Sequence, residues 1–103
     1  MQQNSCGREP FALRVVGDSM APEFYDGCII IIDPEGVISD GCFVMARHED
    51  GYVFRQLEYG DGVYYLKTLQ DGHEIIELAD FGPIEGVVIQ RAGRRRSERK
   101  HYL

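Results

Sequence analysis

Ser19 is the residue of this sequence whose type and surroundings best suit chemistry. It lies in the segment GDSMAP (residues 17–22), in which Gly17 permits a tight turn and leaves the serine hydroxyl accessible at the end of an expected strand. A serine hydroxyl becomes a nucleophile for acyl transfer only when a neighbouring base accepts its proton. The identity of that base therefore decides whether this chain can be an enzyme.

The histidines do not supply an obvious base. His73 follows an Asp-Gly turn and His101 lies near the C-terminus, so both are expected to be ordinary surface residues. His48 ends an expected strand beside a turn and is the histidine best suited to a functional role. The adjacent carboxylates Glu49 and Asp50 are interpreted as solvated turn residues rather than as an acid–base pair.

The elements that must position Ser19 are predicted to be strands. Short β-branched and aromatic runs alternate with turns that contain Gly or Asp, a pattern typical of all-β domains. Residues 20–26 contain a proline and are expected to form an irregular segment or a single turn. The expected strands are residues 11–16, 28–32, 42–48, 52–58, 63–69, 74–78 and 84–91.

Length and composition indicate one soluble globular domain. The chain has 103 residues, of which 44% are hydrophobic and 27% charged. It has no run near the ~18 apolar residues that a membrane-spanning helix needs, and its N-terminus does not resemble a signal peptide. We therefore expect no membrane association and a cytoplasmic location. The expected organisation is an N-terminal extension (residues 1–10), a domain (residues 11–90) and a basic tail (residues 91–103).

Charge is distributed unevenly along the chain. Residues 91–100 carry six basic groups and one acidic group, or +5, which leaves −11 for residues 1–90. A body this acidic repels a nucleic-acid backbone, so the domain is not expected to read DNA itself. The basic tail is expected to be a solvated, partly disordered end.

The cysteines favour neither a metal site nor a disulfide framework. Cys6, Cys28 and Cys42 are odd in number and show no CxxC spacing. Cys28 and Cys42 lie beside apolar runs and are expected to be small buried side chains in a reducing compartment. No cofactor is predicted.

The segment around Ser19, together with its flanks, resembles one known family. An apolar strand, GDSMAP, the pair Asp26-Gly27 with its apolar run, an Ala-Arg-x-x-Asp-Gly turn at residues 46–51 and the closing FGPIEGVV (residues 81–88) are similar to the C-terminal domains of LexA, UmuD and phage repressors. Signal peptidases are more distant relatives. The likeness runs from about Phe11 to Ile89, and it implies an all-β fold of coiled, partly barrel-like sheets.

The resemblance implies a serine–lysine mechanism. Ser19 matches the nucleophile, and the N–H groups of Asp18 and Ser19 match the donors that stabilise the oxyanion. The family's lysine, neutral through burial, is the base, and the residue at its position is Arg55, in VFRQL (residues 53–57). A guanidinium stays protonated at neutral pH and cannot accept the serine proton. We therefore expect that self-cleavage has been lost.

Lys67 is the alternative base. It lies on the strand expected to pair with the one that carries Arg55, and the turn between them sets its side. A two-residue turn at 60–61 or 61–62 places Lys67 opposite Phe54 or Gln56, on the other face from Arg55. A three-residue loop at 60–62 makes Lys67 and Arg55 neighbours. The sequence leaves this register open.

The resemblance also implies roles and partners. Relatives cut themselves at Ala-Gly or Cys-Gly bonds a few dozen residues before the serine, but Cys6-Gly7 lies only twelve residues before it, so we interpret that match as coincidence. The expected function is the dimerising regulatory domain of a repressor, in some relatives responding to a recombinase filament in the SOS response. An N-terminal DNA-reading domain is missing from the sequence, so DNA contact is expected only through such a domain. The alternatives are an active serine peptidase and a UmuD-like polymerase accessory.

Overall fold

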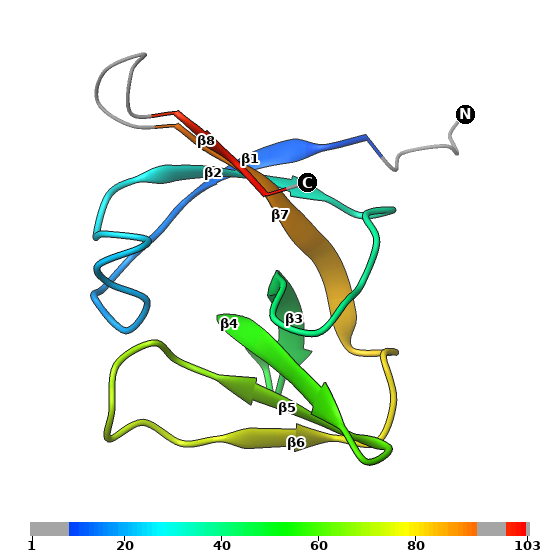
Figure 1. Ribbon diagram of the computed structural model, residues 1–103. Coiled ribbons are helices and arrows are strands. Elements are labelled where there is room, and N and C mark those ends of the chain that lie inside the picture. The colour runs from blue at the N-terminus through cyan, green and yellow to red at the C-terminus, as the bar shows by residue number, and fades with distance from the viewer. Residues whose placement is uncertain (1–8, 93–98, 103) are drawn as a thin grey trace.

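The all-β expectation is confirmed. The computed structural model describes residues 9–92 and 99–102, which form strands and turns with no helix (Figure 1). The strands in this part of the chain are β1 (Phe11–Arg14), β2 (Ile29–Asp33), β3 (Phe43–His48), β4 (Gly51–Gly60), β5 (Val63–Lys67), β6 (Ile76–Leu78), β7 (Ile84–Ala92) and β8 (Lys100–His101). None of the described residues belongs to a helix that could cross a membrane.

The strands form a single antiparallel sheet. Its order is β1-β2-β7-β3-β4-β5-β6, with β8 added beside β7. Figure 1 shows the long strand β7 joining β1, β2 and β8 at one end of the molecule to β3–β6 at the other. The terminal strands of this order, β1 and β6, do not pair with each other, so the sheet is coiled but open.

Irregularities in β7 help the sheet to coil. The register shifts between Ile31 and Ile32 where β2 meets β7, and between Met45 and Ala46 where β3 meets β7. Bulges of this kind bend a strand and increase its twist. One long strand can therefore serve both halves of the sheet.

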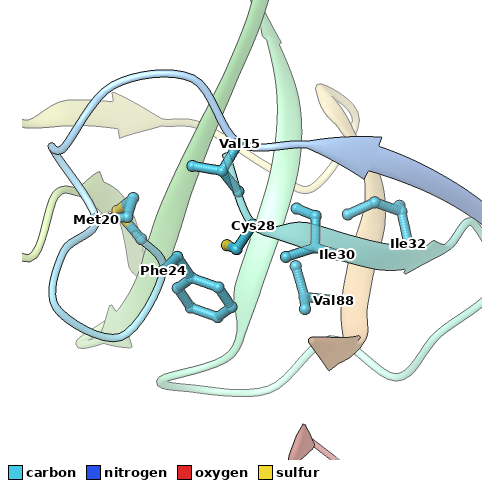
Figure 2. Close-up of a cluster of buried hydrophobic side chains, with 7 residues drawn as sticks. All are labelled: Val15, Met20, Phe24, Cys28, Ile30, Ile32 and Val88. Carbon is cyan, nitrogen blue, oxygen red and sulfur yellow. The ribbon is translucent and has the colours of Figure 1, made fainter. Parts of the chain in front are cut away.

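Two hydrophobic clusters fill the interior. The first lies under β1 and β2 and contains Val15, Met20, Phe24, Cys28, Ile30, Ile32 and Val88 (Figure 2). The second lies among β3–β7 and contains Val44, Ala46, Leu57, Leu66, Ile76, Leu78 and Val87. The segment that carries Ser19 contributes Met20 and Phe24 to the first cluster, so the core itself anchors the candidate site.

The strand ends differ from the sequence prediction in ways that matter for the site. The expected strand 63–69 ends at Lys67, because the N–H groups of Leu69 and Gln70 both donate to the Ser19 carbonyl, at 3.1 Å each. In β2 only one face is fully buried, with Ile30 and Ile32 inside and their neighbours half-buried. Tertiary contacts of this kind are not visible in local sequence patterns.

The C-terminal residues that the structure describes are partly built into the sheet, although Lys100 and His101 are exposed as expected. β7 continues to Ala92, and Lys100–His101 pair with Arg91 and Gln90 as β8. Tyr102 packs its ring 5.3 Å from Phe24 and 5.6 Å from Phe43, centroid to centroid. The run of basic residues gave no sign of this short strand or of the packing of Tyr102 after it. Residues 1–8, with Cys6 and Gly7, residues 93–98 and Leu103 lie outside the described part.

The two described cysteines are free thiols. Cys28 is buried in the first cluster and Cys42 is half-buried, close to what the sequence predicts. Burial raises the pKa of both thiols, which keeps them protonated at neutral pH.

Candidate functional site

Ser19 lies on a tightly held loop, which we call the serine loop (residues 17–27). Gly17 adopts φ +92°, a left-handed conformation that favours glycine, and its N–H donates to Asp26 Oδ1 at 2.8 Å across the loop. The Phe24 N–H donates to the Met20 carbonyl at 2.8 Å, which makes the single turn expected for residues 20–26. Because Met20 and Phe24 are buried beneath it, the loop holds Ser19 in a fixed position.

The polar groups around Ser19 are free to bind. The side chain is half-buried, and within residues 9–92 and 99–102 its hydroxyl makes no hydrogen bond. In the same part of the chain the N–H groups of Asp18 and Ser19 donate to no acceptor. Unused donors beside a serine hydroxyl suit an anion or a polarised carbonyl.

Ser19 and Arg55 line the same cavity, which we call the Ser19 cleft. Its volume is about 330 Å³. The residues that line it come from the end of β1, the serine loop, β2 and the first half of β4: Leu13, Arg14, Val15, Val16, Ser19, Met20, Ile30, Tyr52, Val53, Phe54 and Arg55. Two of these are arginines and none is acidic, in a chain whose first 90 residues carry −11.

The Arg55 guanidinium is held at the edge of β4. The Leu57 N–H donates to the carbonyl of Cys42, just before β3. Residues that bond to the neighbouring strand alternate with residues that do not along an antiparallel ladder, so the N–H and C=O groups of Phe54 point away from β3. Arg55 Nη1 donates to the Phe54 carbonyl at 2.9 Å. Arg55 Nε is buried and has no partner within the described residues. The guanidinium therefore lies at the unpaired edge of β4 and has N–H groups that no described acceptor uses.

Burial lowers the pKa of Arg55, and the nearby Glu74 carboxylate opposes that shift. An arginine starts so far above neutrality that it stays charged at pH 7. Arg55 can thus donate to Ser19 or to an anion in the cleft, but it cannot accept the serine proton.

Lys67 lies elsewhere. The turn between β4 and β5 is the two-residue Asp61–Gly62, with both residues at positive φ, and it pairs Gln56 with Lys67. Lys67 is therefore on the opposite face from Arg55, as predicted for this turn. Its amine forms an ion pair with Glu58, and the side chain lines a different cavity, together with Leu69, Gln70 and His73.

No histidine of the described residues lines the Ser19 cleft. His48 ends β3, and its Nε2 lies 3.2 Å from Glu49 Oε2. His73 and His101 are exposed, the latter in β8. The described residues also contain no cluster of three His, Cys, Asp or Glu side chains that could hold a metal ion.

Sequence reasoning missed two features of the site. Arg14 and Tyr52 line the cleft, although nothing in their local sequence distinguishes them from other exposed strand residues. Glu23, on the serine loop, accepts hydrogen bonds from Lys100 Nζ at 2.6 Å and from the Tyr102 hydroxyl at 2.5 Å. Both depend on contacts between distant segments, so only the fold reveals them.

Comparison with known proteins identifies similar chains. A sequence profile described as Peptidase S24-like matches residues 2–89. The HTH-type transcriptional regulators for conjugative elements R391 of Providencia rettgeri and SXT of Vibrio cholerae are each 38% identical over 87 residues, which is 78% of this chain and 40% of theirs. Repressor protein C2 of Salmonella phage P22 is 36% identical over 90 residues, 82% of this chain and 42% of its own. The chain thus spans about two fifths of the length of these relatives.

Proposed function

Because this chain belongs to the Peptidase S24-like family, we propose that it acts as the regulatory domain of a repressor of the phage or conjugative-element type, and that it has lost self-cleavage. The similar proteins are transcriptional regulators and a repressor, which favours this role over that of a polymerase accessory. In this role the domain forms homodimers in the cytoplasm and gives avidity to an attached DNA-binding domain.

The observation that carries the proposal is the guanidinium of Arg55 in the Ser19 cleft. General-base catalysis needs a group that can hold the serine proton, and deprotonating an arginine at pH 7 costs at least ~7 kcal/mol. The lysine of the domain body, Lys67, is on the opposite face of the sheet, where its ammonium group forms an ion pair with Glu58. Without a base, a signal from a recombinase filament has no cleavage to trigger.

The test is incubation of the protein at pH 7 and at pH 10, followed by intact mass spectrometry, beside a Ser19→Ala variant. We expect no fragment that depends on Ser19 at either pH, since alkaline conditions that would neutralise a lysine leave Arg55 charged. A Ser19-dependent fragment would show an active peptidase. Its loss in Lys67→Ala would then assign the base to Lys67.

Homodimer formation is tested separately by sedimentation velocity over a concentration series. We expect a reversible shift from monomer to dimer mass. A monomer at the highest concentration would remove the avidity role while leaving the chemistry of the cleft untouched.

A further inference from the structure

We propose that the Ser19 cleft binds the free C-terminal carboxylate of an extended, apolar peptide. The inference deepens the proposed function, because it rests on Arg55 remaining charged and on the bound peptide not being cut. The inference adds a ligand for the cleft, which the proposed function does not name.

Positive charge without an ion pair is found in the Ser19 cleft. Four described basic side chains each form an ion pair with a carboxylate: Arg47, Lys67, Arg91 and Lys100. Arg14, Arg55 and the exposed Arg99 form none within the described residues, and of these Arg14 and Arg55 line the Ser19 cleft. The Glu74 carboxylate is near enough to influence the pKa of Arg55, but none of the described residues that line the cleft is acidic, so an anionic ligand suits it.

The cleft also has an excess of hydrogen-bond donors. Arg55 has five N–H groups and is bonded to one acceptor, the Phe54 carbonyl, and the Ser19 hydroxyl has no partner in the described part of the chain. The Arg55 Nε has no acceptor either, but it is buried, so a ligand would be bound by the other guanidinium N–H groups. An arginine only donates, and each oxygen of a carboxylate accepts. Charge-assisted bonds from a guanidinium to a carboxylate are among the strongest that proteins make. A carboxylate therefore satisfies what the cleft leaves unsatisfied.

Two strand edges without a partner strand border the cleft. The Val15 N–H donates to the Cys28 carbonyl at 2.8 Å, so the backbone groups of Arg14 and Val16 face away from β2 by the alternation of the ladder. Across the cleft, the backbone of Phe54 likewise faces away from β3, and its carbonyl already accepts a hydrogen bond from Arg55. An extended peptide can pair with such an edge as an added strand.

The position of Arg55 favours a chain terminus over an acidic side chain as the ligand. Arg55 is bonded to the Phe54 carbonyl, so its guanidinium lies at the level of the strand backbone. A terminal carboxylate lies in the line of a paired peptide backbone, whereas side chains of a strand alternate above and below it. The exposed Leu13, Val16 and Tyr52 beside the cationic groups match apolar side chains on the peptide.

The experiment uses a pool of fluorescein-labelled octapeptides, randomised over Ala, Val, Leu and Phe in the last four positions, with either a free or an amidated C-terminus. We expect fluorescence polarisation to show binding of the free-acid pool and at least about tenfold weaker binding of the amidated pool, since a charged hydrogen bond is lost. Arg55→Gln and Arg14→Gln should each weaken binding of the free-acid pool. Arg47→Gln, outside the cleft and paired with Glu85, should leave it unchanged.

Equal binding of the two pools, or no binding of the free-acid pool, overturns the proposal. So does preferential binding of an amidated pool that carries one internal glutamate, which would assign the cleft to acidic side chains. If Arg14→Gln and Arg55→Gln change self-association and not peptide binding, the occupant is a second copy of the chain. Mass spectrometry of the recovered peptides separates the two proposals, because cut peptides would contradict the lost cleavage even where binding persists.

Discussion

At the scale of single residues, the chemistry of this chain depends on the difference between two cations. Burial, which lowers the pKa of Arg55, would also lower the pKa of a lysine at that position, and the lysine could then reach its neutral form. The guanidinium cannot. Both side chains are cations in their protonated forms, so the exchange chiefly alters whether the proton can be given up. The hydrogen bonds that hold the serine loop, from Gly17 to Asp26 and from Phe24 to Met20, do not involve Arg55.

Arg55→Lys is therefore expected to activate Ser19 towards a fluorophosphonate probe, which reacts with nucleophilic serines and needs no scissile segment. Labelling should rise with pH as the new amine loses its proton, and the native protein should remain unlabelled. The double variant Ser19→Ala/Arg55→Lys is the control and should not react. A labelled native protein would contradict the assignment of Arg55 as an inert replacement.

The residues of the site were only partly predictable from the sequence. GDSMAP and VFRQL indicate Ser19 and Arg55 through their resemblance to a family, and the structure lines one cavity with both. The side on which Lys67 lies depended on the length of one turn, which the sequence left open between several registers. Arg14 could not be found, because its role comes from the approach of β1 to β4 and not from any local pattern.

At the scale of elements, the last strand of the sheet holds the serine loop. Glu23 of the loop accepts hydrogen bonds from Lys100 and Tyr102, and its backbone carbonyl accepts one from Arg91. Burial and the bond to Glu23 raise the pKa of Tyr102, so its hydroxyl stays protonated and remains a donor. Strands from the two ends of the described chain thus meet at the loop.

This clamp makes stability depend on pH. The hydrogen bond from Lys100, then that from Tyr102, lower the pKa of Glu23 below its ordinary value of 4.5. A carboxyl whose pKa is lower when folded stabilises the protein above its unfolded pKa, and that contribution is lost as the pH falls through the folded value. Urea unfolding should show Glu23→Gln to be less stable than the native protein at pH 7, with a smaller difference near pH 3. An unchanged difference would exclude Glu23 as the titrating group.

Phe24 is the packing anchor of the same loop. Its ring is fully buried, and its centroid lies 4.7 Å from that of Phe43 and 4.9 Å from that of Phe54, in edge-to-face contacts. Phe24→Ala should lower the free energy of unfolding by ~3–5 kcal/mol, because a large aromatic side chain is removed from a packed core. Val37→Ala, at an 83% exposed position, is the control and should change it by less than about 0.5 kcal/mol. Similar losses in both variants would argue against the loop as part of the core.

The strands were easier to predict than the site. Alternating apolar residues and Gly or Asp turns located seven of the strands to within a few residues, because local pattern and buried face agree there. β8 was missed because its two residues are charged or polar and its support is the pairing with β7 and the packing of Tyr102. Bulges in β7 could not be predicted either, since they arise where one strand serves two differently oriented neighbours.

At the scale of the whole molecule, charge predicts a poor DNA ligand. With −11 on residues 1–90, the chain alone should give no shift of duplex DNA in an electrophoretic assay at 150 mM salt and micromolar protein. Any binding at low salt should fall steeply as salt is added, since most of the basic residues able to contact phosphate lie at the C-terminal end. Sequence-specific binding at 150 mM salt would contradict the proposed division of labour between this domain and a separate DNA reader.

The Asp61–Gly62 turn has a consequence for how Ser19 could be given a base. A three-residue turn at 60–62 would carry Lys67 to the face of Arg55, but it would also displace Leu66 from its partner Leu57, and both leucines are fully buried. The buried pair therefore opposes that change of register. A lysine in place of Arg55 leaves that pair undisturbed, so a base is gained more easily at position 55 than through the hairpin.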